Sequence, residues 1–394
     1  MCGICGIIKT KSFRFRLEEM VESMTKRGPD DNGYWYSGVS DVSLGHARLS
    51  IIDTSEHGHQ PMQSHSKRYT IVFNGEIYNY RELRYELEKG KSRFDSNSDT
   101  EVLLNAWERW GLDTPKKLRG MFAFAIWDEK EKKLTLVRDR IGIKPLLWHK
   151  GNEHFIFASS VKSILASGQV EPVMNQEAFY DFMSLGSVFQ PRTIIKDVFS
   201  LMPGSFMIID QHSNIIKEDI YWELSSDEEL VKEIQTLRYQ EQVVKTRNLL
   251  EEACRYHLIS DVPVGSFLSG GVDSTIITAL MARLSPYPVK SFSIGFEDGL
   301  DLKNELTEAK NAAHHIGCDH TEVMLSGKEV ANNFDDFINS IDQPSYDGIN
   351  TYWVSKVSRE HVKVALSGLG GDELFAGYDH FGWPKRFNSS NSSF

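Results

Sequence analysis

Cysteine stands at position 2, directly after the initiator methionine. Removal of Met1 would leave Cys2 with a free α-amine, a group whose pKa in short peptides is about 7.7–8.0. An amine of that basicity can take the thiol proton near neutral pH, and the thiolate is the nucleophilic form of cysteine. One residue would then supply both the nucleophile and the base for attack on a carbonyl group.

Cys5 follows three residues later, so Cys2-Gly-Ile-Cys5 is also a candidate redox or zinc-binding pair. No second pair of Cys or His residues with metal-ligand spacing follows, and no helix clearly begins at the motif to lower a thiol pKa. The redox or metal interpretation is therefore the weaker one. Cys254 and Cys318 are interpreted as small packed residues, because four cysteines in this chain are too few for a disulfide framework.

Four short motifs accompany Cys2 in the first half of the chain: Arg27-Gly-Pro-Asp30, Gly45-His-Ala-Arg-Leu-Ser-Ile-Ile-Asp53, Phe73-Asn-Gly-Glu-Ile-Tyr-Asn79 and Ser98-Asp-Thr-Glu101. Taken singly, each has an ordinary explanation: Asn74-Gly75 as a turn, Asp99 as a helix cap and Arg48 as a surface charge. Together with Gly120-Met-Phe-Ala-Phe-Ala and Arg138-Asp-Arg-Ile-Gly-Ile-Lys-Pro145, they resemble the class II, N-terminal-cysteine glutamine amidotransferases, and specifically the asparagine synthetase family. The resemblance runs in register from Cys2 to about Ser163.

This resemblance implies a glutamine pocket with assigned roles. Cys2 would attack the carboxamide, and the Asn74 side chain with the Gly75 backbone N–H would form the oxyanion hole. Arg48 would bind the substrate carboxylate, which a guanidinium fork matches bidentately. Asp99 would pair with the substrate ammonium group. The rest of the pocket is expected from Leu49, Ser50, Ile51, Ile52 and Glu76.

Two glycine-rich loops follow apolar strands in the second half: Ser269-Gly-Gly-Val-Asp-Ser274 and Ser367-Gly-Leu-Gly-Gly-Asp-Glu373. The first lacks the Gly-Lys-Ser/Thr of a Walker A loop, and alone it is equally well explained as a simple βα turn. Backbone N–H groups at the start of a helix nevertheless suit a phosphate group. From about Val243 to Tyr378 the chain resembles the ATP-pyrophosphatase domain of the same family, which cleaves ATP between the α and β phosphates.

The resemblance also implies the nucleotide contacts. Asp273 and Asp372 would bind Mg²⁺, which usually accepts one or two carboxylates together with substrate phosphates. ATP would contact Leu268, Ser269, Gly270, Gly271, Asp273, Ser274, Ile294, Ser367 and Gly368. In the family, ATP adenylates an acceptor carboxylate, and ammonia from glutamine travels through an internal tunnel and displaces AMP to form an amide.

The second half departs from the family in two ways. The best-known aspartate-using members carry glutamate where Leu369 stands, and a different pattern from Asp342 to Tyr352, a segment that normally faces the acceptor. The family domain also continues further, to a catalytic lysine, so we expect the synthetase half to be incomplete here. The acceptor is therefore aspartate or another carboxylate such as a sugar acid. A bare glutaminase or a nucleotide-binding regulator is a third interpretation.

Hydrophobic periodicity predicts the elements that position these residues. An α+β region is expected first, with helices over Leu17–Lys26, Tyr80–Lys89 and Thr100–Trp110 among short strands. From Val243 strands alternate with helices, which implies a parallel α/β sheet. The expected fold is an N-terminal-nucleophile αββα sandwich over residues 1–205, a connecting segment over 206–240 and a partial α/β ATP-pyrophosphatase domain over 241–394.

The composition of the chain argues against two other classes of function, nucleic-acid binding and membrane association. The 394 residues carry a formal net charge of −11, which argues against non-specific binding to nucleic acid or to an anionic membrane. No apolar run approaches the roughly 18–20 residues that a membrane span needs. The sequence therefore predicts a cytoplasmic enzyme whose partners are glutamine, ATP and a carboxylate acceptor. Oligomeric state stays open, with a homodimer as one candidate.

Overall fold

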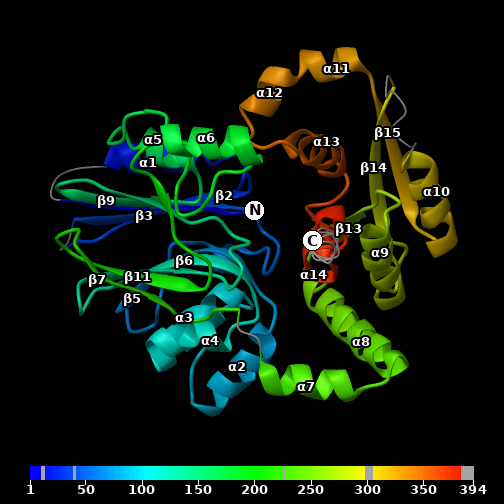
Figure 1. Ribbon diagram of the computed structural model, residues 1–394. Helices are drawn as coiled ribbons and strands as arrows, with labels where there is room; N and C mark the ends of the chain where they lie inside the picture. The colour runs from blue at the N-terminus through cyan, green and yellow to red at the C-terminus, as the bar shows by residue number, and fades with distance from the viewer. Residues whose placement is uncertain (10–13, 39–40, 225–226, 298–304, 383–394) are drawn as a thin grey trace, which may run out of the picture. The chain divides into compact units, whose positions relative to one another are not determined.

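The computed structural model describes residues 1–9, 14–38, 41–224, 227–297 and 305–382, and the chain forms two compact units (Figure 1). The first unit consists of Met1–Val231 together with Ile341–Tyr346. The second unit consists of Lys232–Ser340 and Asp347–Phe394.

Two six-stranded antiparallel sheets face each other in the first unit. The first has the order β10-β8-β9-β1-β3-β2, and the second has the order β12-β11-β7-β6-β5-β4. The strands of the first sheet are β1 (Gly3–Lys9), β2 (Asp31–Tyr36), β3 (Val42–Arg48), β8 (Leu147–Lys150), β9 (His154–Ala158) and β10 (Phe199–Ser200). Those of the second are β4 (Met62–Gln63), β5 (Tyr69–Ile77), β6 (Gly120–Asp128), β7 (Lys133–Arg138), β11 (Ser205–Asp210) and β12 (Ile215–Ile220).

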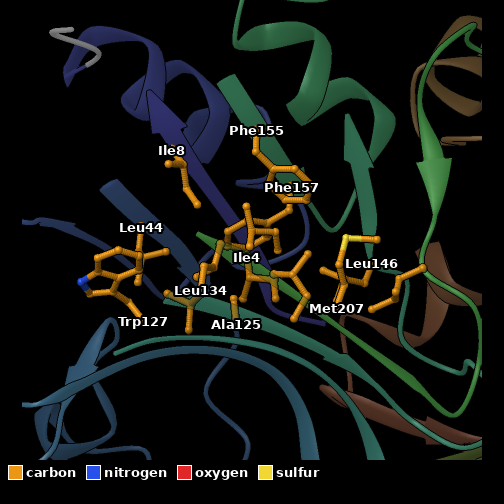
Figure 2. Packing of buried hydrophobic residues seen from close by; sticks show 14 of the residues in the cluster. Ile4, Ile8, Leu44, Ala125, Trp127, Leu134, Leu146, Phe155, Phe157 and Met207 are labelled. Carbon is orange, nitrogen blue, oxygen red and sulfur yellow. The ribbon is translucent and has the colours of Figure 1, made fainter. Parts of the chain in front are cut away.

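Strand alternation divides the core of this unit in two. Ile4 and Ile8 of β1 lie in the cluster between the sheets with residues such as Trp127 and Phe157, as Figure 2 shows. The intervening residue Cys5 lies instead in a second cluster with the helical residue Leu17. Successive side chains of a strand point to opposite faces, so even-numbered residues of β1 face the other sheet and odd-numbered residues face the helices.

Helices cover the outer face of each sheet. α1 (Arg14–Glu22) and α5 (Val161–Ala166) pack against the first sheet and against each other, while α3 (Asp99–Trp110) packs on β5 and against α2 (Tyr80–Lys89) (Figure 1). The buried residues of α2 recur at the spacing of one helical face. The remaining helices are η1 (Glu56–Gly58), η2 (Gly111–Asp113), α4 (Thr114–Lys117) and α6 (Gln176–Leu185). The expected αββα sandwich is confirmed.

The segment expected to connect the two halves needs correction. β11 and β12 pair with each other, and β11 pairs with β7, so residues 205–220 complete the second sheet. Phe206, Met207 and Ile209 are buried there. Later in the same expected connecting segment, residues 225 and 226 lie outside the described residues, and α7 (Glu228–Thr236) buries none of its residues.

The second unit contains a four-stranded parallel sheet with the order β15-β14-β13-β16. Its strands are β13 (Val264–Phe267), β14 (Lys290–Phe296), β15 (Asp319–Leu325) and β16 (Val364–Leu366). Its helices are α8 (Tyr239–His257), α9 (Val272–Leu284), α10 (Glu305–Ile316), α11 (Gly327–Asn332), α12 (Phe334–Ile338), α13 (Gly348–Ser358), α14 (Gly371–Phe375) and η3 (Asp379–Gly382). The predicted alternation of strands and helices is confirmed. Across the described parts of both units, no helix has the length and apolarity that a membrane crossing requires.

Candidate active site

Several residues predicted for the glutamine pocket lie on strand faces that point into the space between the two facing sheets. Asn74 and Glu76 lie on the same face of β5 as Val72, which belongs to the cluster between the sheets. Arg48 lies on the same face of β3 as Leu44, another member of that cluster. Cys2 directly precedes β1 and shares the parity of Ile4. Strand alternation therefore brings residues from three distant strands to one place.

Cys2 is held at the start of β1 by three backbone contacts. Its Sγ lies 3.4 Å from the amide N of Leu49, which donates to it, and 3.5 Å from the Leu49 carbonyl. The Cys2 carbonyl accepts a hydrogen bond from Nε of Arg27 at 3.3 Å. Burial raises the pKa of the thiol, whereas the Leu49 N–H, the terminal ammonium group, Lys144 and Arg48 lower it. The sulfur is therefore fixed, and its surroundings include groups that stabilise a thiolate.

Cys5 has a different environment. Both Cys2 and Cys5 are free thiols, and Cys5 is fully buried in the cluster between the first sheet and its helices. Burial raises the pKa of the Cys5 thiol well above its ordinary value. The side chain therefore behaves as a small apolar residue of the core.

Asn74 is buried without a polar partner. The side chain is 1% exposed, and neither Oδ1 nor Nδ2 has a hydrogen-bond partner among the described residues. Leaving a buried amide unpaired costs roughly 1–3 kcal/mol, so such a group is rare unless a ligand completes it. At the neighbouring Gly75 a Cβ would overlap the carbonyl oxygen of Met121 and approach Cα of Phe122 to 2.7 Å. Only glycine fits beside this amide.

Arg48 is buried, so its interpretation as a surface charge is wrong. The side chain is 6% exposed, and its guanidinium donates to the Asp53 carbonyl and, at 2.8 Å, to the Ser55 carbonyl. Ser50 in the same turn donates its amide N–H to Oδ2 of Asp30 at 2.8 Å. Arg48 and Asp30 thus shape the turn that carries the predicted pocket residues Leu49, Ser50, Ile51 and Ile52.

The acidic side of the pocket consists of Asp99 and Glu76. Asp99 is 4% exposed, and its Oδ2 accepts the Ile77 amide N–H at 2.9 Å. Burial, with a smaller contribution from the Glu76 charge, raises the pKa of Asp99 to about 7. Burial also raises the pKa of Glu76, against the charges of Lys144 and the terminal ammonium group. An arriving ammonium group would stabilise both carboxylates.

Two further charged residues belong to this site without having been assigned a role from the sequence. Lys144 is 5% exposed, burial lowers its pKa, and the charges that act on it include those of Glu76 and Cys2. Its amide N–H donates to Oδ2 of Asp139 at 2.9 Å, which fixes the loop. The second of these residues is Arg27, whose Nε donates to the Cys2 carbonyl. A signal existed for Lys144, because a lysine within Ile-Gly-Ile-Lys-Pro-Leu-Leu is surrounded by apolar neighbours and must find a partner when buried.

The first glycine-rich loop of the second unit lies between β13 and α9. Oγ of Ser274 accepts the Ser269 amide N–H at 3.2 Å and lies 3.0 Å from Oγ of Ser269. Gly270 has a φ of +81°, and a Cβ there would lie 2.7 Å from the amide N of Ala309. Gly271 is the N-cap of α9 and offers no side chain to cap it. The first turn of this helix therefore presents N–H groups without a side-chain cap, a geometry that suits an anion.

The second glycine-rich loop packs against the first. A Cβ at Gly368 would lie 2.6 Å from the amide N of Ser274, and one at Gly371 would overlap Oδ2 of Asp273. Asp372 follows Gly371 directly, so both predicted metal-binding aspartates lie at the carboxyl ends of the adjacent strands β13 and β16. Two carboxylates at one edge of a sheet match the ligand preference of Mg²⁺.

The other predicted nucleotide residues lie at the same edge of the sheet. Leu268 is 1% exposed, and its carbonyl accepts a hydrogen bond from Oγ of Ser293 in β14. Ile294 is the next residue of that strand, and Oγ of Ser367 accepts the Leu369 amide N–H at 3.3 Å. Ligands of open parallel sheets bind at this edge.

Comparison with known proteins finds a matching domain family for each half of the chain. Residues 1–222 match the glutamine amidotransferase domain family, and residues 245–393 match the asparagine synthase family. The chain is 37% identical over 397 residues to asparagine synthetase [glutamine-hydrolyzing] 1 of Bacillus subtilis, covering 98% of this chain and 60% of that protein. It is 34% identical over 401 residues to putative asparagine synthetase [glutamine-hydrolyzing] 2 of Methanocaldococcus jannaschii, covering 96% of this chain and 76% of that protein.

A third relative, asparagine synthetase [glutamine-hydrolyzing] 3 of Bacillus subtilis, is 33% identical over 410 residues, covering 97% of this chain and 64% of that protein. The chain thus spans 60% and 64% of the length of its two relatives from Bacillus subtilis. The two matched domain families together span most of the chain, and the sequence identity to these relatives extends over both domains. The chain belongs to the family of glutamine-hydrolysing asparagine synthetases.

Proposed function

We propose that the first unit hydrolyses glutamine at Cys2 and that the second unit uses ATP to activate a carboxylate, which the released ammonia converts to an amide. The buried, unpartnered carboxamide of Asn74 is the observation that carries the first part. It shares the space between the sheets with a cysteine held by backbone contacts. An oxyanion hole requires a fixed amide donor that is not already hydrogen-bonded within the protein.

Glutamine hydrolysis would proceed through a thioester. The Cys2 thiolate attacks the carboxamide carbon, and Asn74 with the Gly75 backbone N–H stabilises the negative charge that develops on oxygen. The C–N bond then breaks, and ammonia leaves with a proton from the protonated base. Water attacks the thioester, which releases glutamate and restores the thiol. After removal of Met1, the α-amine of Cys2 would be the base.

Arg48 and Asp99 would orient the substrate. Arg48 binds the α-carboxylate, and Asp99 binds the α-ammonium group with Glu76 beside it. Burial supports both assignments, because an ion pair inside a water-poor site is stronger than one at the surface. It also explains the raised pKa of Asp99, whose carboxylate lacks a cation until substrate arrives.

We expect glutamine affinity to depend on the protonation of Asp99. Its pKa is raised to about 7, so below that pH the free enzyme holds a neutral carboxyl that cannot pair with ammonium. In a Cys2→Ala background, which removes the chemistry, the Kd for glutamine should rise about tenfold per pH unit as the pH falls below the pKa of Asp99. Calorimetric titration measures this, and the Asp99→Asn double variant should bind weakly with a flat pH profile. A flat profile for Cys2→Ala alone would remove Asp99 from the ammonium site.

The second unit would bind ATP at its two glycine-rich loops. The backbone of Ser269, Gly270 and Gly271 at the start of α9 would face the phosphates. Asp273 and Asp372 would hold Mg²⁺, and the bound ion would supply positive charge that offsets the negative charge of the phosphates. Leu268, Ser274, Ile294, Ser367 and Gly368 would line the rest of the nucleotide site.

Aspartate is the acceptor that the family relation supports best. One observation favours a second candidate. Leu369, in the loop after β16, is 87% exposed, and its side chain offers neither charge nor hydrogen bond at the position where the resemblance implies glutamate in aspartate-using members. An acceptor without an amino group, such as a sugar acid, would not need that carboxylate. The proposal is thus a carbon–nitrogen ligase, with aspartate first and another carboxylate second.

Pyrophosphate release tests the complete proposal. With glutamine, ATP and Mg²⁺ present, we expect pyrophosphate to form only when an acceptor is added, and mass spectrometry should detect asparagine when that acceptor is aspartate. Replacing glutamine by ammonium chloride bypasses the first unit and serves as the control. Glutamate production without acceptor-dependent pyrophosphate would contradict the ligase assignment and leave a bare glutaminase.

A further inference from the structure

The strand that carries the predicted oxyanion hole is unpaired on one side just before Asn74. β5 pairs with β6 along its whole length, but its pairing with β4 covers only two residue pairs and ends where Ile71 lies opposite Met62. Backbone groups of alternate residues point to the same side of an antiparallel strand, so Phe73 is the next residue to face the β4 side. Phe73 is 2% exposed, and its N–H and C=O groups therefore need partners other than a strand.

Two buried side chains supply these partners. Oε1 of Gln60 accepts the Phe73 amide N–H at 2.7 Å, and Nε2 of His46 donates to the Phe73 carbonyl at 3.2 Å. Gln60 and His46 are both buried. Burial lowers the pKa of His46 to about 3, so the ring is neutral, and a carbonyl partner requires its proton to lie on Nε2. The two side chains thus take the place of the strand that has ended.

His46 reaches Phe73 from the opposite sheet. It lies in β3 on the same face as Leu44, which belongs to the cluster between the sheets. In the register of the first sheet it lies opposite Ile4, two residues after Cys2. The hydrogen bond to the Phe73 carbonyl therefore crosses the space between the sheets and ties β5 to the sheet that carries the nucleophile.

Gln60 holds a second buried group. Its Nε2 donates to Oγ1 of Thr100 at 3.1 Å, and Thr100 directly follows Asp99 in the first turn of α3. At Gly33 in β2 a Cβ would overlap the carbonyl oxygen of Gln60, so only glycine lets Gln60 come this close. One side chain therefore links the backbone beside Asn74 to the helix start that carries Asp99.

The His46 ring has one nitrogen to spare. Its Nδ1 is buried with no hydrogen-bond partner among the described residues. A buried acceptor left unpaired lowers stability, which offsets what the bond to Phe73 contributes. Stability alone therefore explains an imidazole at this place poorly, whereas the need to hold the Phe73 carbonyl explains it directly.

We propose that His46 and Gln60 are positioning residues for glutamine hydrolysis, which hold the strand that presents the oxyanion hole. The inference rests on the proposed glutaminase activity. The Phe73 carbonyl and Cα of Asn74 belong to one planar peptide group, so holding the carbonyl fixes the base of the Asn74 side chain. The Asn74 carboxamide has no hydrogen-bond partner among the described residues, so its backbone must position it. Misplacement of a catalytic group by about 1 Å can lower the rate about a hundredfold.

Replacement of His46 tests the proposal in the intact chain. His46→Leu should lower kcat for glutamine hydrolysis about tenfold with little change in KM, because the Phe73 carbonyl loses its donor. His46→Gln should recover most of this loss, since a glutamine side chain can also donate from Nε2. In an Asn74→Ala background His46→Leu should change kcat by less than about threefold, because the side chain that it positions is gone. Steady-state assays of glutamate release measure each constant.

Replacement of Gln60 should give a different signature. Gln60→Met keeps the shape but removes both hydrogen bonds, so it should lower kcat about tenfold and also raise KM severalfold, because Thr100 beside the predicted ammonium-binding Asp99 is released. Thr114→Val is the matched control. Oγ1 of Thr114, a fully buried residue, donates to the Ala106 carbonyl near the end of α3 at 3.1 Å. Its loss should lower the melting temperature and leave kcat within about twofold of wild type.

The double variants distinguish positioning from stability. An equal loss of kcat from His46→Leu in both backgrounds, or an equal loss from Thr114→Val, would mean that His46 only stabilises the fold and would overturn the inference. Unchanged kcat in His46→Leu, or no recovery in His46→Gln, would overturn it too. If His46→Leu does not fold, Gln60→Met in the same two backgrounds provides the comparison. A wild-type chain that hydrolyses no glutamine would instead refute the proposed function.

Discussion

Replacement of Cys2 by alanine should abolish glutamine-dependent chemistry and leave ammonia-dependent chemistry intact. Loss of a catalytic nucleophile typically lowers kcat by roughly 10⁴-fold or more. Pyrophosphate release with ammonium chloride should stay within about twofold of wild type, since it depends on the second unit. Glutamate formation and pyrophosphate formation, measured on the same preparation, distinguish the two effects.

Cys5→Ala is the control for this experiment. Cys5 lies in the core between the first sheet and its helices, so its replacement should cost about 1 kcal/mol of unfolding free energy and leave glutamine hydrolysis nearly unchanged. Loss of hydrolysis in a folded Cys5→Ala variant would revive the interpretation of Cys2 and Cys5 as a functional pair. Retention of hydrolysis in Cys2→Ala would exclude Cys2 as the nucleophile.

Removal of the Asn74 side chain should produce the second-largest effect. Asn74→Ala should lower kcat for glutamine hydrolysis about 10²–10³-fold, which corresponds to the roughly 2.7–4 kcal/mol typical of one oxyanion-hole donor. KM should change little, because the donor acts most strongly after the tetrahedral intermediate begins to form. Steady-state assays of glutamate release measure both constants.

Stability provides an independent check on Asn74. Its amide has no hydrogen-bond partner among the described residues, so alanine should leave the melting temperature unchanged or raise it. A structural asparagine would behave in the opposite way and lower the melting temperature on replacement. Asn74→Asp keeps the shape but places a negative charge beside the developing oxyanion, so it should lose at least as much activity as alanine. Normal kcat in both variants would show that the oxyanion hole lies elsewhere.

Local patterns of the chain predict much of the fold. α2 is predicted to the residue, because its apolar positions recur at helical spacing and Gly90 follows its last residue. The parallel sheet is equally recognisable, since strands and helices alternate regularly after α8. The predicted boundary after residue 205 is too early, because the short strands β11 and β12 become part of the sheet only when β11 pairs with β7 and β12 pairs with β11.

The candidate site is predictable where residues carry their chemistry in short motifs and not where contacts join distant segments. Asn74, Gly75 and Asp99 stand in recognisable motifs, and the structure buries the side chains of Asn74 and Asp99, as it does that of Arg48. Arg48 is buried because it lies on the face of β3 that points toward the second sheet. The sequence of β3 alone does not show which of its two faces another sheet covers. The apolar neighbours of Lys144 in the sequence indicate that it is buried, but no local pattern reveals that its charge lies near Cys2, which is distant in the sequence.

The mass of the N-terminal peptide, after treatment with a glutamine analogue that carries an electrophilic diazoketone, tests the central claim most directly. If Cys2 is the nucleophile, the peptide should begin at Cys2, carry one adduct on that residue and lose the adduct when glutamine competes. Met1 retained on a chain that hydrolyses glutamine, or an adduct confined to Cys5, Cys254 or Cys318, would contradict it.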